Sequence, residues 1–146
     1  MTETERSRAL ELHGFYRRMQ DRENGVNTGV FIRQEEIERR NPSRFTQLLE
    51  GIPSMRLIRS GACGTLWRCY APRGADGCYM SVFLDGHRLN PLHVPPHENP
   101  WLRRDFPDEL ISPGGIAGIE VYARVNQAPP QYQGLAGCGV ILVWTK

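Results

Sequence analysis

The last ten residues constrain the fold more than any other part of this chain. Residues 137–146, Gly-Cys-Gly-Val-Ile-Leu-Val-Trp-Thr-Lys, form a nearly continuous apolar run. A short apolar run without polar alternation is typical of a strand that is buried on both faces of a sheet. The sequence therefore predicts a fully buried strand at this end of the chain.

Two shorter segments predict further strands. Residues 81–86, Ser-Val-Phe-Leu-Asp-Gly, run from a strand into a turn, because Asp-Gly is a strong hairpin signal. Residues 118–122, Gly-Ile-Glu-Val-Tyr, form a second short strand that carries one acidic residue. Alternation along this strand points Glu120 away from its two apolar neighbours. We expect Glu120 to pair with an Arg such as Arg124 or Arg56, in a stabilising role.

The first 51 residues predict helices around one short strand. Residues 5–22 are charged and helix-permissive, residues 30–32 form a strand, and residues 34–40 form a helix. Asn41 is expected to cap the start of a further helix that Gly51 ends.

The middle of the chain predicts a small hairpin and a long loop. Residues 55–59 alternate like a half-buried strand and can pair with residues 65–70. Residues 90–107 are rich in proline and lack periodicity, so we expect a loop there, followed by a one-turn helix at residues 107–111. Together the elements predict an α+β fold, a small mixed β-sheet flanked by short helices.

Composition limits the possible functions. The 18 basic residues are 17 Arg and one Lys, with 13 basic and 9 acidic side chains in residues 1–73 (+4) against 5 and 7 in residues 74–146 (−2). Most of these Arg alternate with Glu, as on a solvated helix face, and no basic stripe with interleaved aromatics suggests nucleic-acid binding. No apolar segment approaches the roughly 20 residues of a membrane-spanning helix.

Taken in chain order, the three strand segments resemble the plug domain of TonB-dependent outer-membrane receptors. In those receptors a Gly-Val-Ile-x-x-x-Thr-Lys stretch, matched here from Gly139 to Lys146, closes the plug, and the transmembrane barrel follows. Residues 29–53 are similar to the opening of the plug, where a strand leads to a helix and a second helix ends in a Leu-Leu-x-x-x-Pro turn. Arg33 departs from the family, which usually has Ser or Thr there.

The resemblance implies a plug-like domain at residues 29–146, preceded by a charged helix or linker at residues 1–28. The family motif falls on five residues: Asp85, Gly86, Glu120, Gly139 and Thr145. A plug-like fold implies association with outer-membrane transport, an outer-membrane or periplasmic partner and a location in the periplasm or at the outer membrane, although residues 1–8 lack a signal-peptide pattern.

The resemblance also implies a disulfide. Smaller, barrel-less plug-like domains resemble this chain in having Cys at the positions of Cys78 and Cys138, and these residues adjoin two strands that we expect to be close in one sheet. Such a bridge would close a loop of about 60 residues and add about 4 kcal/mol. The alternative is two buried free thiols in a reducing cytosol, and Cys63 and Cys69 can pair or stay free.

Enzymatic activity is not expected, because the chain has no nucleophile motif and no phosphate-binding glycine loop. Asp85 could be a catalytic carboxylate, but Asp-Gly is first a turn dipeptide. His87, His93 and His97 could bind a metal, but their spacing is not helical, so we expect neither a metal nor a cofactor. Trp101 is the aromatic residue expected to be an exposed anchor.

Three functional hypotheses follow. The first is a stand-alone plug-like interaction module without its own barrel. Receptors couple to TonB through an apolar-acidic box near the N-terminus, which residues 1–8 lack, so TonB binding is not predicted. The second is a plug severed from a full receptor for a siderophore, vitamin or glycan. The third is a small metal-binding or enzymatic protein that uses the loop of His87, His93 and His97.

Overall fold

The computed structural model of the 146-residue chain describes residues 8–60, 69–75, 77–89, 107–133 and 138–146. The strands are β1 (Val30–Arg33), β2 (Arg56–Ser60), β3 (Cys69–Arg73), β4 (Ser81–Leu84), β5 (His87–Arg88), β6 (Ile116–Arg124) and β7 (Cys138–Thr145). The helices are α1 (Arg8–Leu12), α2 (Phe15–Glu23), α3 (Gln34–Arg40) and α4 (Pro107–Leu110). Short 3-10 turns are η2 (Phe45–Leu49), η4 (Pro113–Gly115), η5 (Val125–Gln127) and η6 (Pro130–Tyr132).

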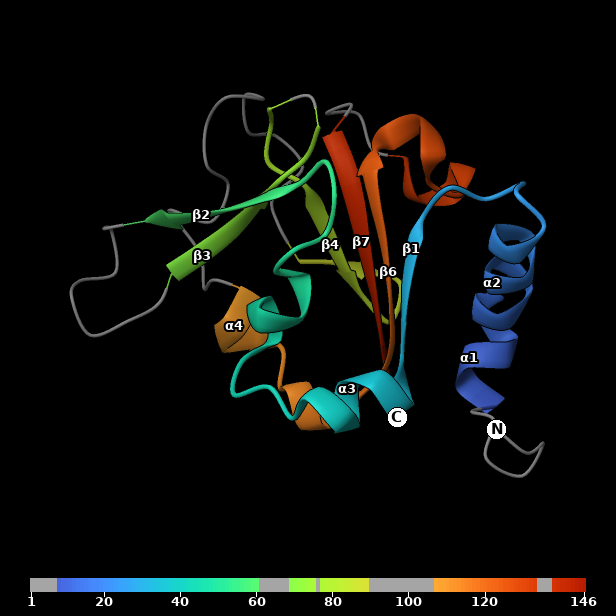
Figure 1. Cartoon of the computed structure of the whole chain (residues 1–146), viewed down its shortest axis with the longest axis horizontal. Helices are drawn as coiled ribbons and strands as arrows, with labels where there is room; N and C mark the ends of the chain where they lie inside the picture. The colour runs from blue at the N-terminus through green and yellow to red at the C-terminus, as the bar shows by residue number, and fades with distance from the viewer. Residues whose placement is uncertain (1–7, 61–68, 76, 90–106, 134–137) are drawn as a thin grey trace.

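A mixed five-stranded sheet with the order β1-β6-β7-β4-β5 forms the centre of the molecule (Figure 1). Strand β7 is antiparallel to β6 and parallel to β4. Its residues Val140, Ile141, Leu142, Val143 and Trp144 are fully buried. The terminal apolar run is therefore the central strand of the sheet, and the predicted α+β fold class is confirmed.

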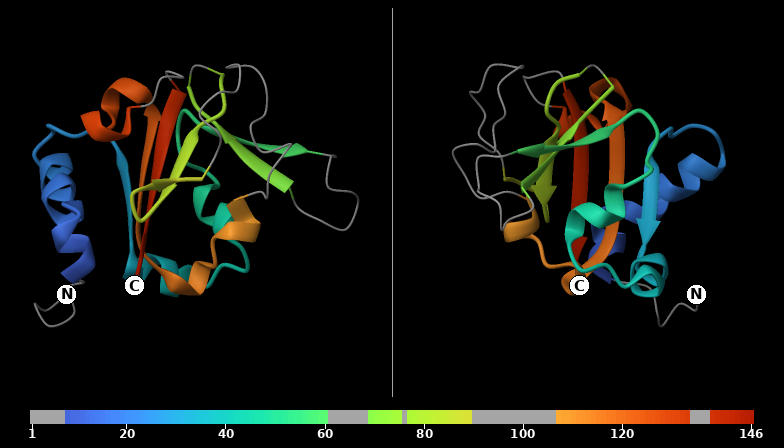
Figure 2. Two further views of the ribbon diagram at one scale, coloured as in Figure 1. Left: turned by 180° about the vertical axis from the view of Figure 1, so that it is seen from behind. Right: turned by 60° about the vertical axis from the view of Figure 1, so that its left-hand side comes forward.

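Each face of the sheet has its own cover (Figure 2). Helices α1 and α2 lie against one face, which we call the helix-covered face, and bury Leu10 and Phe15 against Tyr122, Leu142 and Trp144. The opposite face, which we call the hairpin-covered face, lies under η2 and the two-stranded sheet of β2 and β3. Its buried residues, from both the sheet and its cover, include Ile32, Phe45, Leu48, Leu49, Ala71, Met80, Val82, Ile119, Val121, Ile141 and Val143.

The helices differ from the prediction where glycine and proline interrupt the chain. The single helix expected at residues 5–22 is broken at Gly14, whose φ of 80° is the left-handed conformation that glycine adopts readily. Asn41 does not cap a new helix. It ends α3 in the left-handed conformation, with φ 44°, and Pro42 follows, which disfavours continuation of the helix. Phe45, Leu48 and Leu49 are buried as expected, but on a 3-10 turn.

The two-stranded sheet is shifted relative to the prediction. Strand β2 pairs antiparallel with β3 at residues 69–73, in a register that joins Arg56 to Arg73 and Ser60 to Cys69. Residues 65–68 of the strand predicted at 65–70 lie outside the described residues. The helices in the described part of the chain are all too short or too polar to cross a membrane.

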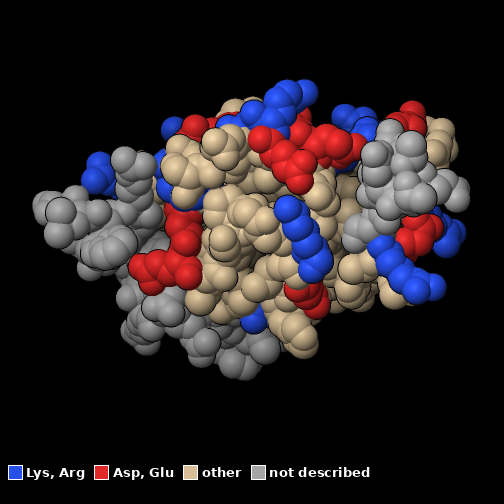
Figure 3. Space-filling view, turned by 90° about the horizontal axis from the view of Figure 1, so that it is seen from below, with Lys and Arg blue, Asp and Glu red and all other residues tan. Residues whose placement is uncertain are grey.

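Charges of both signs share the lower face of the molecule, as Figure 3 shows. On α3, Glu36 lies 3.7 Å from Arg39 and 3.9 Å from Arg40. Glu38 lies 3.6 Å from Lys146 at the end of β7. Exposed ion pairs of this kind contribute little to stability, about 0–1 kcal/mol each. Because they combine charges of both signs, they limit the electrostatic potential of this face.

Candidate functional site

Glu120 is a fully buried carboxylate in the middle of β6, on the helix-covered face. Arg18 of α2 donates from Nε to Oε1 at 2.6 Å and from its terminal nitrogen to Oε2 at 2.7 Å. The hydroxyl of Tyr122 donates to Oε1 at 2.7 Å, and Nε1 of Trp144 donates to Oε2 at 2.6 Å. Each carboxylate oxygen thus accepts two hydrogen bonds, which offsets the cost of burying the charge.

The charge of Glu120 raises the pKa values of its neighbours Arg18 and Tyr122. Burial by itself lowers the pKa of Arg18, but the hydrogen bonds and charge of Glu120 outweigh burial and raise it. Burial and then the charge of Glu120 raise the pKa of the Tyr122 hydroxyl, although Asn27 donates to that hydroxyl at 3.3 Å. Arg18 therefore stays charged and Tyr122 stays a hydrogen-bond donor across the physiological pH range.

The prediction that Glu120 pairs with an Arg is confirmed, but the Arg is neither of the two named candidates, Arg124 and Arg56: the guanidinium that contacts the carboxylate belongs to Arg18. Arg18 and Glu120 are 102 positions apart. A usable signal did exist, since Arg18 follows the buried Phe15 by three positions and helical periodicity places both on one face. What was missing was knowledge of which strand that helix face would cover.

Aromatic rings surround this cluster. His13 stacks on Trp144 with ring centroids 4.4 Å apart, and Phe31 lies edge-on to both Phe15 and Tyr122. Such ring pairs add about 0.5–1.5 kcal/mol beyond the burial of their area. They also exclude water from the carboxylate, so Glu120 is inaccessible to a substrate and serves to hold α2 on the sheet.

Asp85 and Thr145 of the family motif contact each other. Asp85 Oδ1 accepts from the backbone N–H of Thr145 at 2.9 Å, and Oδ2 accepts from the Thr145 hydroxyl at 2.5 Å. Asp85 and Gly86 have φ values of 50° and 87°, as a tight turn between β4 and β5 requires. The turn residue therefore fastens the β4–β5 hairpin to the end of β7.

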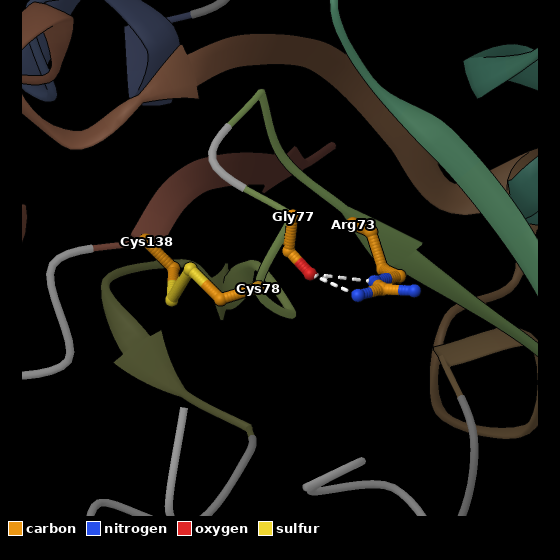
Figure 4. Close-up of a disulfide and its surroundings, with 4 residues drawn as sticks. All are labelled: Arg73, Gly77, Cys78 and Cys138. Carbon is orange, nitrogen blue, oxygen red and sulfur yellow. Dashed lines mark hydrogen bonds between the residues drawn. A yellow bond between two sulfur atoms is a disulfide. The ribbon is translucent and has the colours of Figure 1, made fainter. Parts of the chain in front are cut away.

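Gly139 and the disulfide lie at the other end of β7. A Cβ at Gly139 would come within 2.5 Å of the carbonyl oxygen of Tyr122, so a side chain cannot fit there without moving the backbone. Cys78 and Cys138 form a disulfide with a Cα–Cα distance of 5.8 Å, as the resemblance implied (Figure 4). Nearby, Arg73 donates from Nε to the carbonyl oxygen of Gly77 at 2.7 Å. The bridge links the segment before β4 to the start of β7.

One buried polar contact was missed by the sequence analysis. Asp108 of α4 accepts from the backbone N–H of Thr46 at 2.8 Å and from its hydroxyl at 2.6 Å. Burial raises the pKa of Asp108, although these hydrogen bonds and the charge of Arg44 act in the opposite direction. The contact ties α4 to η2 at the margin of the hairpin-covered face.

The remaining predicted site residues do not form a cluster among the described residues. His87 is exposed on the edge strand β5, while His93, His97, Trp101 and Cys63 lie outside the described residues. No group of three potential metal ligands forms among the residues that are described. The metal hypothesis and the fates of Trp101, Cys63 and Cys69 thus stay predictions.

Comparison with known proteins gives a fold likeness. No family model matches the chain, and no curated protein matches it either. The siderophore receptor PirA from Acinetobacter baumannii superposes with a TM-score of 0.56 and 16% identity, over 88% of this chain. A variant of the ferric enterobactin receptor PfeA from Pseudomonas aeruginosa, in complex with enterobactin, superposes with a TM-score of 0.51 and 20% identity, over 82% of this chain.

The chain spans only 18% of the length of each of these two receptors. At 16–20% identity, the likeness concerns the fold alone: an α+β unit that matches part of each of these receptors.

Proposed function

We propose that this protein is a non-enzymatic, plug-like interaction module of the cell envelope that associates with an outer-membrane transport protein. The observation that carries the proposal is the superposition of 88% of the chain on part of a siderophore receptor. A domain that forms a small part of a transport receptor normally contacts the rest of that receptor. We infer that this chain likewise acts through contact with an envelope protein.

The disulfide supports a location outside the cytosol. Structural disulfides persist in oxidising compartments such as the periplasm and are rare in the cytosol. The bridge between Cys78 and Cys138 spans 60 residues, so its formation would stabilise the fold by about 4 kcal/mol on the chain-entropy estimate.

The buried polar contacts support a non-enzymatic role. Glu120 has no exposed surface, and both oxygens of Asp85 accept hydrogen bonds from Thr145. Each of these carboxylates has a structural task that explains its position. A catalytic acid or base needs access to its substrate, which Glu120 lacks.

The test is the location and partner of the chain in its native cells. We expect fractionation to place a tagged chain in the envelope, and peptide mapping without reduction to recover the linked Cys78 and Cys138 peptides. Crosslinking with a photoreactive residue at Leu12, which is 81% exposed, should capture an identified outer-membrane protein. The same chain left without irradiation is the matched control. A cytosolic chain with alkylatable thiols at both positions would contradict the proposal.

A second candidate is favoured by the 18% coverage of the neighbours: the chain is the plug portion of a full receptor for a siderophore, vitamin or glycan. Genomic sequence decides between the two. A reading frame that continues past Lys146 into alternating ten-residue strands would support the second candidate. A stop codon there, with the chain in the envelope, would support the independent module.

A further inference from the structure

Strand β1 is an edge of the central sheet. It pairs with β6 on one side, and no strand among the described residues pairs with its other side (Figure 1). In an antiparallel pair, alternate residues direct their backbone N–H and C=O groups away from the partner strand, so two of the four residues of β1 present these groups at the open edge. Apart from the ladder with β6 and the start of α3, the backbone of β1 makes no hydrogen bond with any described residue.

This edge lacks the features that usually protect an edge strand. Natural sheets blunt their edges with very short strands, with Lys or Pro, or with bulges. Strand β1 consists of Val, Phe, Ile and Arg in an unbroken register with β6, and Ile32 is only 3% exposed. The opposite edge strand, β5, is blunted by its length, because it has only two residues, His87 and Arg88. Of these two edges, β1 is therefore the one that can accept a further strand.

A cavity lies beside each end of β1, and the two cavities are on opposite faces of the sheet. At the start of β1, a cavity of about 200 Å³ on the hairpin-covered face is lined by Val30, Val121 and Ile52. At its end, a cavity of about 320 Å³ on the helix-covered face is lined by Arg33 and Tyr16. Positions 30 and 33 are an odd number of residues apart, so their side chains point to opposite faces. In a strand laid along β1, a residue opposite Val30 would face the first cavity, and a residue opposite Arg33 would face the second.

The second cavity carries an excess of negative charge. It is lined by Glu35 and Glu38 and by one cation, Arg33, which lies 3.1 Å from Glu35. The Gln34 amide and Lys146 both contact Glu38 through Oε1, at 3.0 Å and 3.6 Å, so Oε2 has no partner among the described residues. A basic side chain placed beside the end of β1 would therefore find an available carboxylate oxygen.

We propose that the open edge of β1 binds an extended segment of the envelope partner, which adds a strand to the sheet antiparallel to β1. Backbone hydrogen bonds to β1 hold the segment, and its side chains on alternate faces select its sequence. The segment places a basic residue opposite Arg33 and a compact apolar residue opposite Val30, in the order basic-x-x-apolar. This inference rests on the proposed function, because it names the surface through which the envelope partner is held.

The probe is the peptide acetyl-Ser-Lys-Thr-Thr-Val-Thr-Ser-amide, titrated into the purified, oxidised chain and followed by NMR. We expect saturable binding with a Kd below about 1 mM. Hydrogen exchange of two alternate amides among Val30, Phe31, Ile32 and Arg33 should slow at least about tenfold in the complex, because these amides then donate to the peptide instead of water. Unchanged exchange along β1 would overturn the inference.

Two N-methylated peptides test the backbone part. One is methylated at Lys and at the Thr before Val, the other at the Thr after Lys and at Val, so each lacks N–H donors on one edge only. Since one edge of the peptide faces β1, one version should bind at least about tenfold more weakly and the other within about threefold of the parent. Equal affinity of all three peptides, or equal loss in both methylated versions, would mean that no strand is added.

Two variants of the chain test the side-chain part. Glu38→Gln should weaken binding about threefold, as for an exposed ion pair, and should not affect a peptide in which norleucine replaces Lys. Glu36→Gln removes the same charge from α3 outside the cavity and should change binding less than about twofold. Amide shifts away from the cavity should stay unchanged in both variants, which establishes that each remains folded. Equal weakening by the two variants would reduce the effect to net charge and overturn the choice of a basic residue.

Sedimentation of the free chain tests whether a second copy occupies the edge instead. A dimer whose β1 amides are protected without peptide would overturn the proposal of a partner segment. The peptide experiments use the purified chain, so their result is separate from its location in cells. A chain that binds the peptide but fractionates with the cytosol would contradict the proposed function alone, whereas an envelope chain that does not bind the peptide would contradict this inference alone.

Discussion

The two faces of the central sheet are closed by different chemistry. On the hairpin-covered face, apolar side chains of η2 and the small sheet pack on Ile119, Ile141 and Val143, and the Thr46–Asp108 contact lies at the margin. On the helix-covered face, an ion pair between Arg18 and Glu120 is buried among aromatic rings. Both covers bury apolar surface, but among the described residues the fully buried charge, that of Glu120, lies under the second cover.

The two covers therefore differ in the free-energy cost of a substitution that weakens them. Apolar packing is non-directional, so its loss costs free energy in proportion to the area exposed and the cavity left. A buried ion pair is different, because removing one partner leaves the other charge buried and unpaired. The N-terminal helices are therefore fixed in one register on the sheet by Glu120, whereas η2 is held mainly by apolar packing, with the Thr46–Asp108 contact at its margin.

The largest expected effect is at Arg18. Arg18→Met keeps much of the apolar stem but leaves the Glu120 carboxylate with only the Tyr122 and Trp144 donors. We expect the free energy of unfolding to fall by about 4 kcal/mol, within the 3–5 kcal/mol typical of breaking a buried pair. Urea denaturation followed by circular dichroism measures it.

Arg17→Met, at the exposed neighbouring position, is the matched control and should cost little. Adding Glu120→Gln to Arg18→Met removes the orphaned charge and should restore at least half of the loss. If the double variant is as unstable as Arg18→Met, the loss comes from packing and not from the unpaired charge.

The second-largest effect is expected on the hairpin-covered face. Leu48 is fully buried under the sheet, and Leu48→Ala should cost about 3 kcal/mol, in the 2–5 kcal/mol range for a large-to-small change in a core. Leu110→Ala is the control, because Leu110 is 38% exposed and should cost less than about 1 kcal/mol. Denaturant unfolding measures both, and equal losses would show that η2 is not part of the core.

A smaller effect is expected at the end of β7, where Thr145 contacts Asp85 of the β4–β5 turn. Thr145→Val removes the hydroxyl that donates to Asp85 Oδ2 but keeps the side-chain shape and the backbone bond to Oδ1. We expect a loss of about 1.5 kcal/mol, as for one hydrogen bond to a charged group. Thr28→Val, at an exposed threonine, should be nearly neutral, and an equally neutral Thr145→Val would mean that Asp85 does not depend on this hydroxyl.

The smallest effect concerns pH. Because burial raises the pKa of Asp108 in the folded state above its ordinary value of 3.8, the folded chain binds this proton more tightly than the unfolded chain does. The stability contributed by protonated Asp108 is present at low pH and is lost as pH rises through its folded pKa. Asp108→Asn should remove this part of the pH dependence in denaturant unfolding between pH 3 and 7. The same change at the exposed Glu23, Glu23→Gln, is the matched control.

The positions of the strand segments along the chain and the position of α3 could be predicted from the sequence, since they rest on local signals. The run from Val140 to Trp144 is apolar at every position, which only a strand buried on both faces explains. The Asp85-Gly86 turn specifies a hairpin by its own conformational preferences. Asn41 was misjudged because the same residue type serves at the start and at the end of a helix, and Pro42 fits either reading.

The partners of the polar groups could not be predicted in this way. The amino-acid sequence by itself determined that residues 140–144 would be buried and that Glu120 would face away from Ile119 and Val121. Only the tertiary structure decided that Arg18, 102 positions away, would neutralise Glu120, and that Thr145, 60 positions away, would hold Asp85. The physical reason is that periodicity and turn preferences act between near neighbours, whereas a buried charge finds its partner through the order of the strands and the face that each helix covers.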